Sequence, residues 1–146
     1  MTATYEQARN ETFALVKATA DIVAPSIRID WQGKENNTPP QQDEEWLAVS
    51  MRHSPTGSRQ ASLSCEHGQR RWRREGMLYV QCFAPLSAGG LKRAMELACA
   101  FRDGIQESKG TLSGVWFRDP TAQEVGPDRN WFNANASARF TYDEVK

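Results

Sequence analysis

The segment from Phe132 to Tyr142 alternates between apolar and polar side chains without a break, and no other pattern constrains the fold as strongly. One set is apolar or aromatic throughout: Phe132, Ala134, Ala136, Ala138, Phe140 and Tyr142. The intervening set is polar: Asn133, Asn135, Ser137, Arg139 and Thr141. Successive side chains of a strand point to opposite faces, so this pattern predicts a strand about 35 Å long with one buried and one solvated face.

Two other segments have the apolar spacing of amphipathic helices. In the first, Thr4 and Gln7 form a capping-box pair, and apolar residues recur at helical spacing until Pro25 ends the run. This helix is about 20 residues long. In the second, which starts at Gly90, the apolar positions are Leu91, Ala94, Met95, Ala98, Phe101 and Ile105.

Shorter alternating runs predict strands at 26–31, 46–53, 77–83 and 115–119. Between the second and third lies a predicted hairpin that places Leu63 opposite Trp72, with Ser62 and Ser64 opposite Arg73 and Arg71. A slip of one residue would exchange its two faces. Glu75 and Gly76 predict a bulge. Residues 120–130 are rich in turn formers and predict a connection.

The resulting order is one helix, four strands, a second helix and two strands. It predicts an α+β fold, in which an antiparallel or mixed β-sheet has two amphipathic helices packed on one face. The length of 146 residues suits one globular domain, so we expect a single domain over residues 1–146. Residues 33–44 lack periodicity and predict a mobile loop.

Composition excludes some classes of function. Lys plus Arg and Asp plus Glu each total 18, so no overall charge would draw the chain to nucleic acid or to a membrane. Apolar runs are far shorter than the roughly 20 residues that span a bilayer, and the N-terminal residues do not resemble a secretion signal. The three cysteines, Cys65, Cys82 and Cys99, are expected to be reduced thiols of a cytosolic protein.

No motif for catalysis, a cofactor or a metal emerges. Cys65 and His67 are too few for a zinc site. The acidic residues suit solvated positions better than a magnesium site, both those at 43–45 and those elsewhere: Asp119, Asp128, Asp143 and Glu144. Ser87–Gly90 precedes a helix as a phosphate nest would, but without the phosphate-loop spacing it indicates a tight turn. The residues therefore support no enzyme class, and we expect no cofactor and no metal.

The strongest local signal is a cluster of arginines. The stretch 52–74 holds six of them and a single acid, Glu66. Arginine favours paired contacts to carboxylates or phosphates, which indicates a protein or DNA surface. A solvated hairpin whose arginine stems cover Trp72 is the alternative. The residues predicted to contact a partner or line a DNA channel are Arg59, Arg70, Arg71, Arg73 and Arg74.

The order of motifs is similar to that of a known family. A strand ending in "IRIDW", a long Pro/Asn loop, "EEWLAVSM", "RRWRREGMLYVQCFAP", "GGLKRAMELACAFR" and "NWFNANASARFTYDE" follow an N-terminal helix. Together they resemble small phage and prophage proteins of the tail terminator, or tail-completion, type, many of which are known only as a phage-related domain of unknown function. The resemblance runs from Tyr5 to Glu144 and includes no catalytic signature.

This resemblance implies a structural protein of the virion tail that is not an enzyme and is assembled in the cytoplasm of a bacterial host. Such proteins form a hexameric ring on the completed tail tube, end tube polymerisation and provide the surface on which the head or its connector docks. The implied partners are other copies of the chain, the tube protein, the head–tail connector protein and genome DNA passing through the lumen, with no membrane. Asp43 and Glu44 are expected to contact a partner when the loop orders. A small nucleic-acid-binding module that uses the arginine ribbon, with Trp72 as a stacking platform, is the alternative function.

Overall fold

The computed structural model describes residues 2–56, 59–60, 68–108 and 114–146. Along the chain the elements are α1 (Tyr5–Val23), β1 (Arg28–Trp31), β2 (Trp46–His53), β3 (Arg59–Gln60), β4 (Arg71–Pro85), the short 3-10 helix η1 (Leu86–Ala88), α2 (Gly90–Glu107), β5 (Trp116–Asp128) and β6 (Trp131–Val145).

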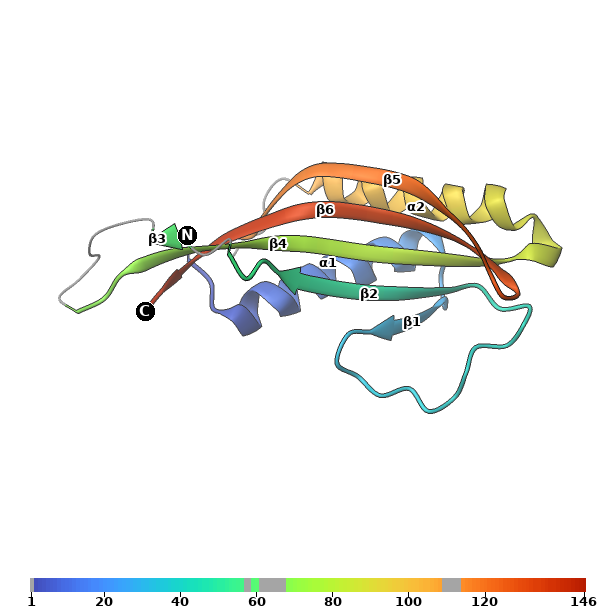
Figure 1. Ribbon diagram of the computed structural model, residues 1–146, viewed down its shortest axis with the longest axis horizontal. Coiled ribbons are helices and arrows are strands. Elements are labelled where there is room, and N and C mark those ends of the chain that lie inside the picture. The colour runs from blue at the N-terminus through green and yellow to red at the C-terminus, as the bar shows by residue number, and fades with distance from the viewer. Residues whose placement is uncertain (1, 57–58, 61–67, 109–113) are drawn as a thin grey trace.

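One sheet contains all the described strands. Its order is β1-β2-β4-β6-β5, with β3 added beside β4, and every pair is antiparallel except the parallel pair of β1 and β2. Both helices cover the same face and lie behind the sheet in Figure 1. The predicted α+β class, with a mostly antiparallel sheet and two helices on one face, is confirmed.

β4 and β6 form the centre of this sheet. They pair without interruption from Arg71 opposite Val145 to Pro85 opposite Trp131. The alternation of β6 turns its apolar set toward the helices, where Ala134, Ala136, Ala138 and Phe140 are fully buried. On α2 the facing residues include Ala94 and Ala98, which are also fully buried. These short side chains allow the helix to lie close to the strands.

α1 begins where its capping box predicted. The Thr4 backbone N–H donates to Gln7 Oε1 over 2.9 Å, and the Gln7 N–H donates to Thr4 Oγ1 over 3.2 Å. Both bonds satisfy N–H groups that a helix start leaves unpaired. The helix covers the β1 side of the sheet, where the rings of Phe13 and Trp31 lie 5.0 Å apart.

The predicted connection at 120–130 is wrong, because β5 continues through it to Asp128. Its pairing with β6 shifts register twice, once between Arg118 and Thr121 and once between Glu124 and Gly126. Among the described strands β5 pairs only with β6, so it is an edge strand. Prolines at 120 and 127 can therefore be accommodated, whereas a central strand would lose ladder hydrogen bonds.

Two details of the predicted ribbon are also wrong. Gly76 is not in a bulge, since it pairs in regular register with both His53 and Phe140. Trp72 lies opposite Gln60, and Arg73 lies opposite Arg59, three positions from the predicted register. The partners predicted for this hairpin, Ser62, Leu63 and Ser64, lie outside the described residues.

The junction between β4 and α2 is a compact turn. After Pro85 the chain forms η1, and Gly89 then adopts a left-handed conformation with φ of 72°. A Cβ on Gly90 would lie 3.0 Å from Phe132 Cβ and 3.2 Å from the Pro85 carbonyl oxygen. The two glycines allow the chain to reverse and α2 to start against β6.

Gly76 is expected to be the most sensitive glycine of the sheet. A Cβ there would lie 2.0 Å from the Arg52 carbonyl oxygen and 2.7 Å from Phe140 Cζ, so Gly76→Ala must move backbone in the sheet centre. We expect it to cost about 3 kcal/mol of unfolding free energy, measured by urea denaturation.

Gly104→Ala is the matched control. The three atoms nearest to its new Cβ all belong to the Thr19 side chain, the closest at 2.8 Å, so a side chain and not sheet backbone must move, and alanine favours a helix interior. We expect its stability to stay within about 1 kcal/mol of the native value. Equal losses in the two variants would contradict this explanation.

Candidate interaction surface

The side of the sheet opposite the helices is here called the helix-free face. On β4 the helices cover Leu78, Val80 and Cys82, which are fully buried, so the alternate residues from Arg71 to Phe83 lie on the helix-free face. Register then assigns the polar set of β6 to the same face, together with Trp116 and Arg118 of β5.

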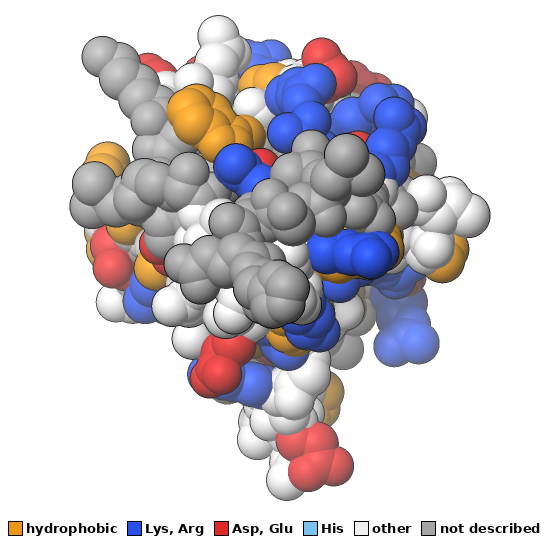
Figure 2. All heavy atoms as spheres, turned by 90° about the vertical axis from the view of Figure 1, so that its left-hand side faces the viewer, with side chains coloured by type: hydrophobic (Ala, Val, Ile, Leu, Met, Phe, Trp, Pro, Cys, Tyr) orange, Lys and Arg blue, Asp and Glu red, His pale blue; other side chains and the backbone are white. Residues whose placement is uncertain are grey.

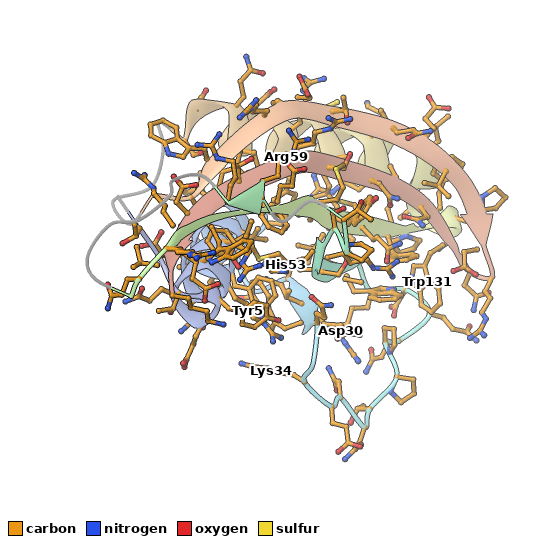
Figure 3. The ribbon with its side chains drawn as sticks, turned by 60° about the vertical axis from the view of Figure 1, so that its left-hand side comes forward. Tyr5, Asp30, Lys34, His53, Arg59 and Trp131 are labelled. Carbon is orange, nitrogen blue, oxygen red and sulfur yellow. The ribbon has the colours of Figure 1, made fainter. Side chains whose placement is uncertain are left out.

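Five arginines of this face gather at one end and form what we call the arginine patch: Arg59, Arg71, Arg73, Arg118 and Arg139. Two adjoining hollows lie within it, of about 310 Å³ and 340 Å³, and Arg118 and Thr141 line both. Figure 2 looks at the end of the sheet that carries β3 and shows Lys and Arg side chains gathered there, and Figure 3 shows Arg59 at this end.

Two arginines of the patch already share an acidic partner within the chain. Asp143 Oδ2 lies 2.7 Å from Arg71 Nη2, and Asp143 Oδ1 lies 3.2 Å from Arg73 Nε. Asp143 is only 8% exposed, so the expectation that it is a solvated carboxylate is wrong. The β4–β6 register brings it beside the arginines, because Arg73 and Asp143 are directly opposite each other.

Arg74 lies on the other face of the ribbon. Its Nε is 3.0 Å from Glu144 Oε2, and its guanidinium lies 5.8 Å from the Trp72 ring centre. Glu144 is also 8% exposed and was likewise expected to be solvated. Arg70 differs again: its backbone exchanges hydrogen bonds with Lys146 while its side chain is exposed. The structure therefore does not bring all five predicted contact arginines to one surface.

The cations that remain available are Arg59, Arg118 and Arg139. All three are exposed, and within the described part of the chain none has an ion pair. Sequence reasoning missed Arg118 and Arg139 because they lie outside the 52–74 cluster. The sequence signal that could have located Arg139 was the polar set of the last strand, to which this arginine belongs. Beside Arg118, Trp116 exposes 59% of its surface.

The acidic loop lies away from the arginine patch. Glu44 accepts the Trp131 Nε1–H on its backbone carbonyl over 2.9 Å, at the opposite end of β6. From Trp131 to Arg139 a strand extends about 27 Å. The Glu44 carboxylate accepts from the Gln41 N–H, whereas Asp43 is exposed. Asn36 donates to Asp30 over 2.9 Å, and the mobility of residues 33–44 stays a prediction.

Glu45 has a structural contact of its own. Its carboxylate receives two hydrogen bonds from Arg93, from Nε over 2.6 Å and from Nη2 over 3.2 Å. The hydrogen bond to Glu45 raises the pKa of Arg93, and burial opposes this rise. This pair connects the start of β2 to the first turn of α2.

His53 lies at the end of β2 among aromatic residues. Its Nε2 and the Tyr142 hydroxyl share a hydrogen bond of 2.8 Å, and its ring is 5.0 Å from the Tyr5 ring (Figure 3). Burial lowers the pKa of His53, and the nearby Arg74 charge lowers it further. Burial also raises the pKa of Tyr142 to about 12, so the hydroxyl is protonated at neutral pH.

The described residues offer no metal centre, since no three of their His, Cys, Asp or Glu side chains converge. Cys65 and His67 lie outside them. Cys82 and Cys99 are free thiols, and burial raises the pKa of Cys82 well above its usual range. None of the helices in the described part is long and apolar enough to span a membrane.

Comparison with known proteins identifies the fold alone. No protein-family model matches the sequence, and no curated protein matches it. A solved structure whose name states no function is similar over 96% of both chains, with a TM-score of 0.66 and 17% sequence identity. The architecture described here therefore also occurs in a protein of very different sequence.

The His53 environment predicts a pH-dependent stability. The folded pKa of His53 lies below 6.5, so between these values the unfolded chain binds more protons than the folded one. Stability should therefore fall as pH decreases from about 6.5 toward the folded pKa.

His53→Gln keeps a hydrogen-bonding group and removes this titration. Urea midpoints at pH 7 and pH 5.5 should differ less for the variant than for the native protein. Every other ionisable group is the same in the two proteins, so its contribution cancels in this comparison. Equal shifts in the two proteins would show that His53 does not contribute.

Proposed function

We propose that this chain is a structural subunit of the phage tail terminator kind, which forms a ring on the tail tube and is not an enzyme. The observation that supports it is the arginine patch, where Arg59, Arg118 and Arg139 are exposed without an acidic partner among the described residues. Exposed cations on a sheet face that no helix covers favour contact with an acidic surface.

The two edges of the sheet add a second line of support. A ring in which each subunit contacts the next in the same sense needs two different surfaces per subunit. β1 is a short parallel edge strand of 4 residues, and β5 is an antiparallel edge strand of 13 residues. Each copy thus has unlike surfaces at its two sides.

In this proposal the arginine patch contacts acidic groups of the tube protein or faces DNA in the lumen of a hexameric ring. Arg71 and Arg73 take part only where a partner shares them with Asp143, because both are paired in the free chain. The loop containing Asp43 would contact the neighbouring copy or the head–tail connector protein. The site of action is the tail of the virion, after assembly in the host cytoplasm.

Electron microscopy of polymerising tube protein from the same genome region tests this function. Added native protein should shorten the tubes and cap one end. The variant Arg118→Glu/Arg139→Glu should cap at least about tenfold less well, because reversed charges repel an acidic partner.

The matched control is Lys92→Glu/Arg102→Glu, which reverses two charges of α2 that lie outside the arginine patch. It should cap like the native protein. Tubes of unchanged length with bare ends in the presence of native protein would contradict the proposed function. Equal capping by both double variants would show that the arginine patch does not take part in capping.

The second candidate function is binding of single-stranded nucleic acid. A specific feature favours it: the exposed Trp116 ring lines the same hollow as Arg71, Arg73 and Arg118, as a stacking platform would. Trp72, the residue expected to stack, is half-buried against Arg74. If Arg59, Arg118 and Arg139 each contact a phosphate, the affinity for an oligonucleotide should fall with a log–log salt slope of about −2. Affinity insensitive to salt and to Trp116→Ala would exclude this function.

A further inference from the structure

The outer part of β5 carries an exposed apolar residue at an irregularity of the strand. Between Glu124, opposite Ala134, and Gly126, opposite Asn133, the pairing shifts and Val125 has no partner on β6. Val125 exposes 56% of its surface. A bulge leaves its extra residue outside the ladder, so this residue is available for a contact beyond the sheet.

Acidic residues flank this exposed valine. Glu124 and Asp128 are exposed, and neither has an ion pair within the described residues. Arg129, in the turn to β6, is the nearest basic residue of the segment. We call the segment Glu124–Asp128 the acidic bulge.

A groove of complementary character lies at the other side of the molecule. It has a volume of about 680 Å³ and runs between α1 and the end of β1, with aromatic surface from Tyr5, Phe13 and Trp31. Figure 3 shows Tyr5 and Lys34 on this side of the chain. We call it the α1–β1 groove.

Cations predominate around this groove. Arg9, Lys17 and Lys34 line it, against one acid, Glu6. Arg9 lies over the Phe13 ring at 5.2 Å and donates to the Gln32 carbonyl, so it holds the base of the 33–44 loop. Lys17 is paired with Asp21, and both are exposed, so this pair opposes a new contact only weakly. Lys34 is exposed.

The two surfaces are complementary in charge and in apolar character. One presents a valine between two carboxylates, and the other presents aromatic rings among three cations. They lie at opposite edges of the sheet, since β5 and β1 are the first and last strands of the order in Figure 1. One copy can therefore use both surfaces at the same time without blocking itself.

We propose that the acidic bulge of one copy docks into the α1–β1 groove of the next, with Val125 against the aromatic residues and Glu124 and Asp128 beside Arg9 and Lys34. The contact is heterologous, so it extends to a third copy and closes when the rotation allows. This inference rests on the proposed function, because the contact would join neighbouring subunits of the proposed ring.

Disulfide trapping tests this contact. The variant Ala14→Cys/Val125→Cys places one thiol in the groove and one on the bulge, in a background of Cys65→Ser and Cys99→Ser that keeps only the buried Cys82. Mild oxidation, with and without tail tubes, should produce a ladder of dimers, trimers and larger species that reduction removes. A contact between identical surfaces would stop at the dimer.

Two matched variants sharpen the result. Ile22→Cys/Val125→Cys uses an exposed residue further along α1 that lies outside the groove, and it should give no ladder. Adding Glu124→Lys/Asp128→Lys to the trapping pair should slow the ladder at least about fivefold at low salt. An equal ladder from the Ile22 control, or no ladder in either condition, would overturn the proposed contact.

The outcome is separable from that of the tube-capping experiment. If the native protein caps tubes but no specific ladder forms, the terminator function is supported and the proposed contact is contradicted. If a specific ladder forms but tubes are not capped, the contact is supported and the terminator function is contradicted.

Discussion

The uninterrupted pairing of β4 with β6 is the constraint on which the rest of the structure depends. Fifteen residues of each strand pair in a single register, so every side chain of these two strands is assigned to one face or the other. A shift by one residue would move the alanines of β6 from the helices to solvent. This register requires Gly76, because only a glycine on β4 allows the β2 backbone at Arg52 to approach it so closely.

The same register gives the two faces different roles. One face carries small and apolar side chains that pack against α1 and α2, and together they form one hydrophobic core along the sheet. The other carries polar residues and arginines, and neither of the two described α-helices covers it. Asp143 and Glu144 follow at the end of β6, where the alternation places one carboxylate on each face of the ribbon. Two of the arginines on the helix-free face are thereby neutralised within the chain, and the others remain available to a partner.

A chain of zero net charge can therefore still have a strongly patterned surface. Five of its arginines gather at one end of the helix-free face, its acidic bulge lies on β5, and its basic groove lies beside α1. Electrostatic complementarity of this kind selects and orients partners more than it adds affinity. Such an arrangement suits a subunit that must contact two or more different neighbours, as the proposed ring requires.

The sequence by itself determined the secondary elements with the clearest periodicity. The capping box set the start of α1, the alternation of residues 132–142 set β6 and its two faces, and the order of elements set the α+β class. Local pattern could not reveal β5 beyond Asp119, because an edge strand tolerates prolines and bulges that look like a turn. Nor could it separate paired from available arginines, since Arg73 meets Asp143 only through a contact between residues 70 positions apart. Tertiary structure decided which charges are exposed because strand register, and not distance along the chain, brings those side chains together.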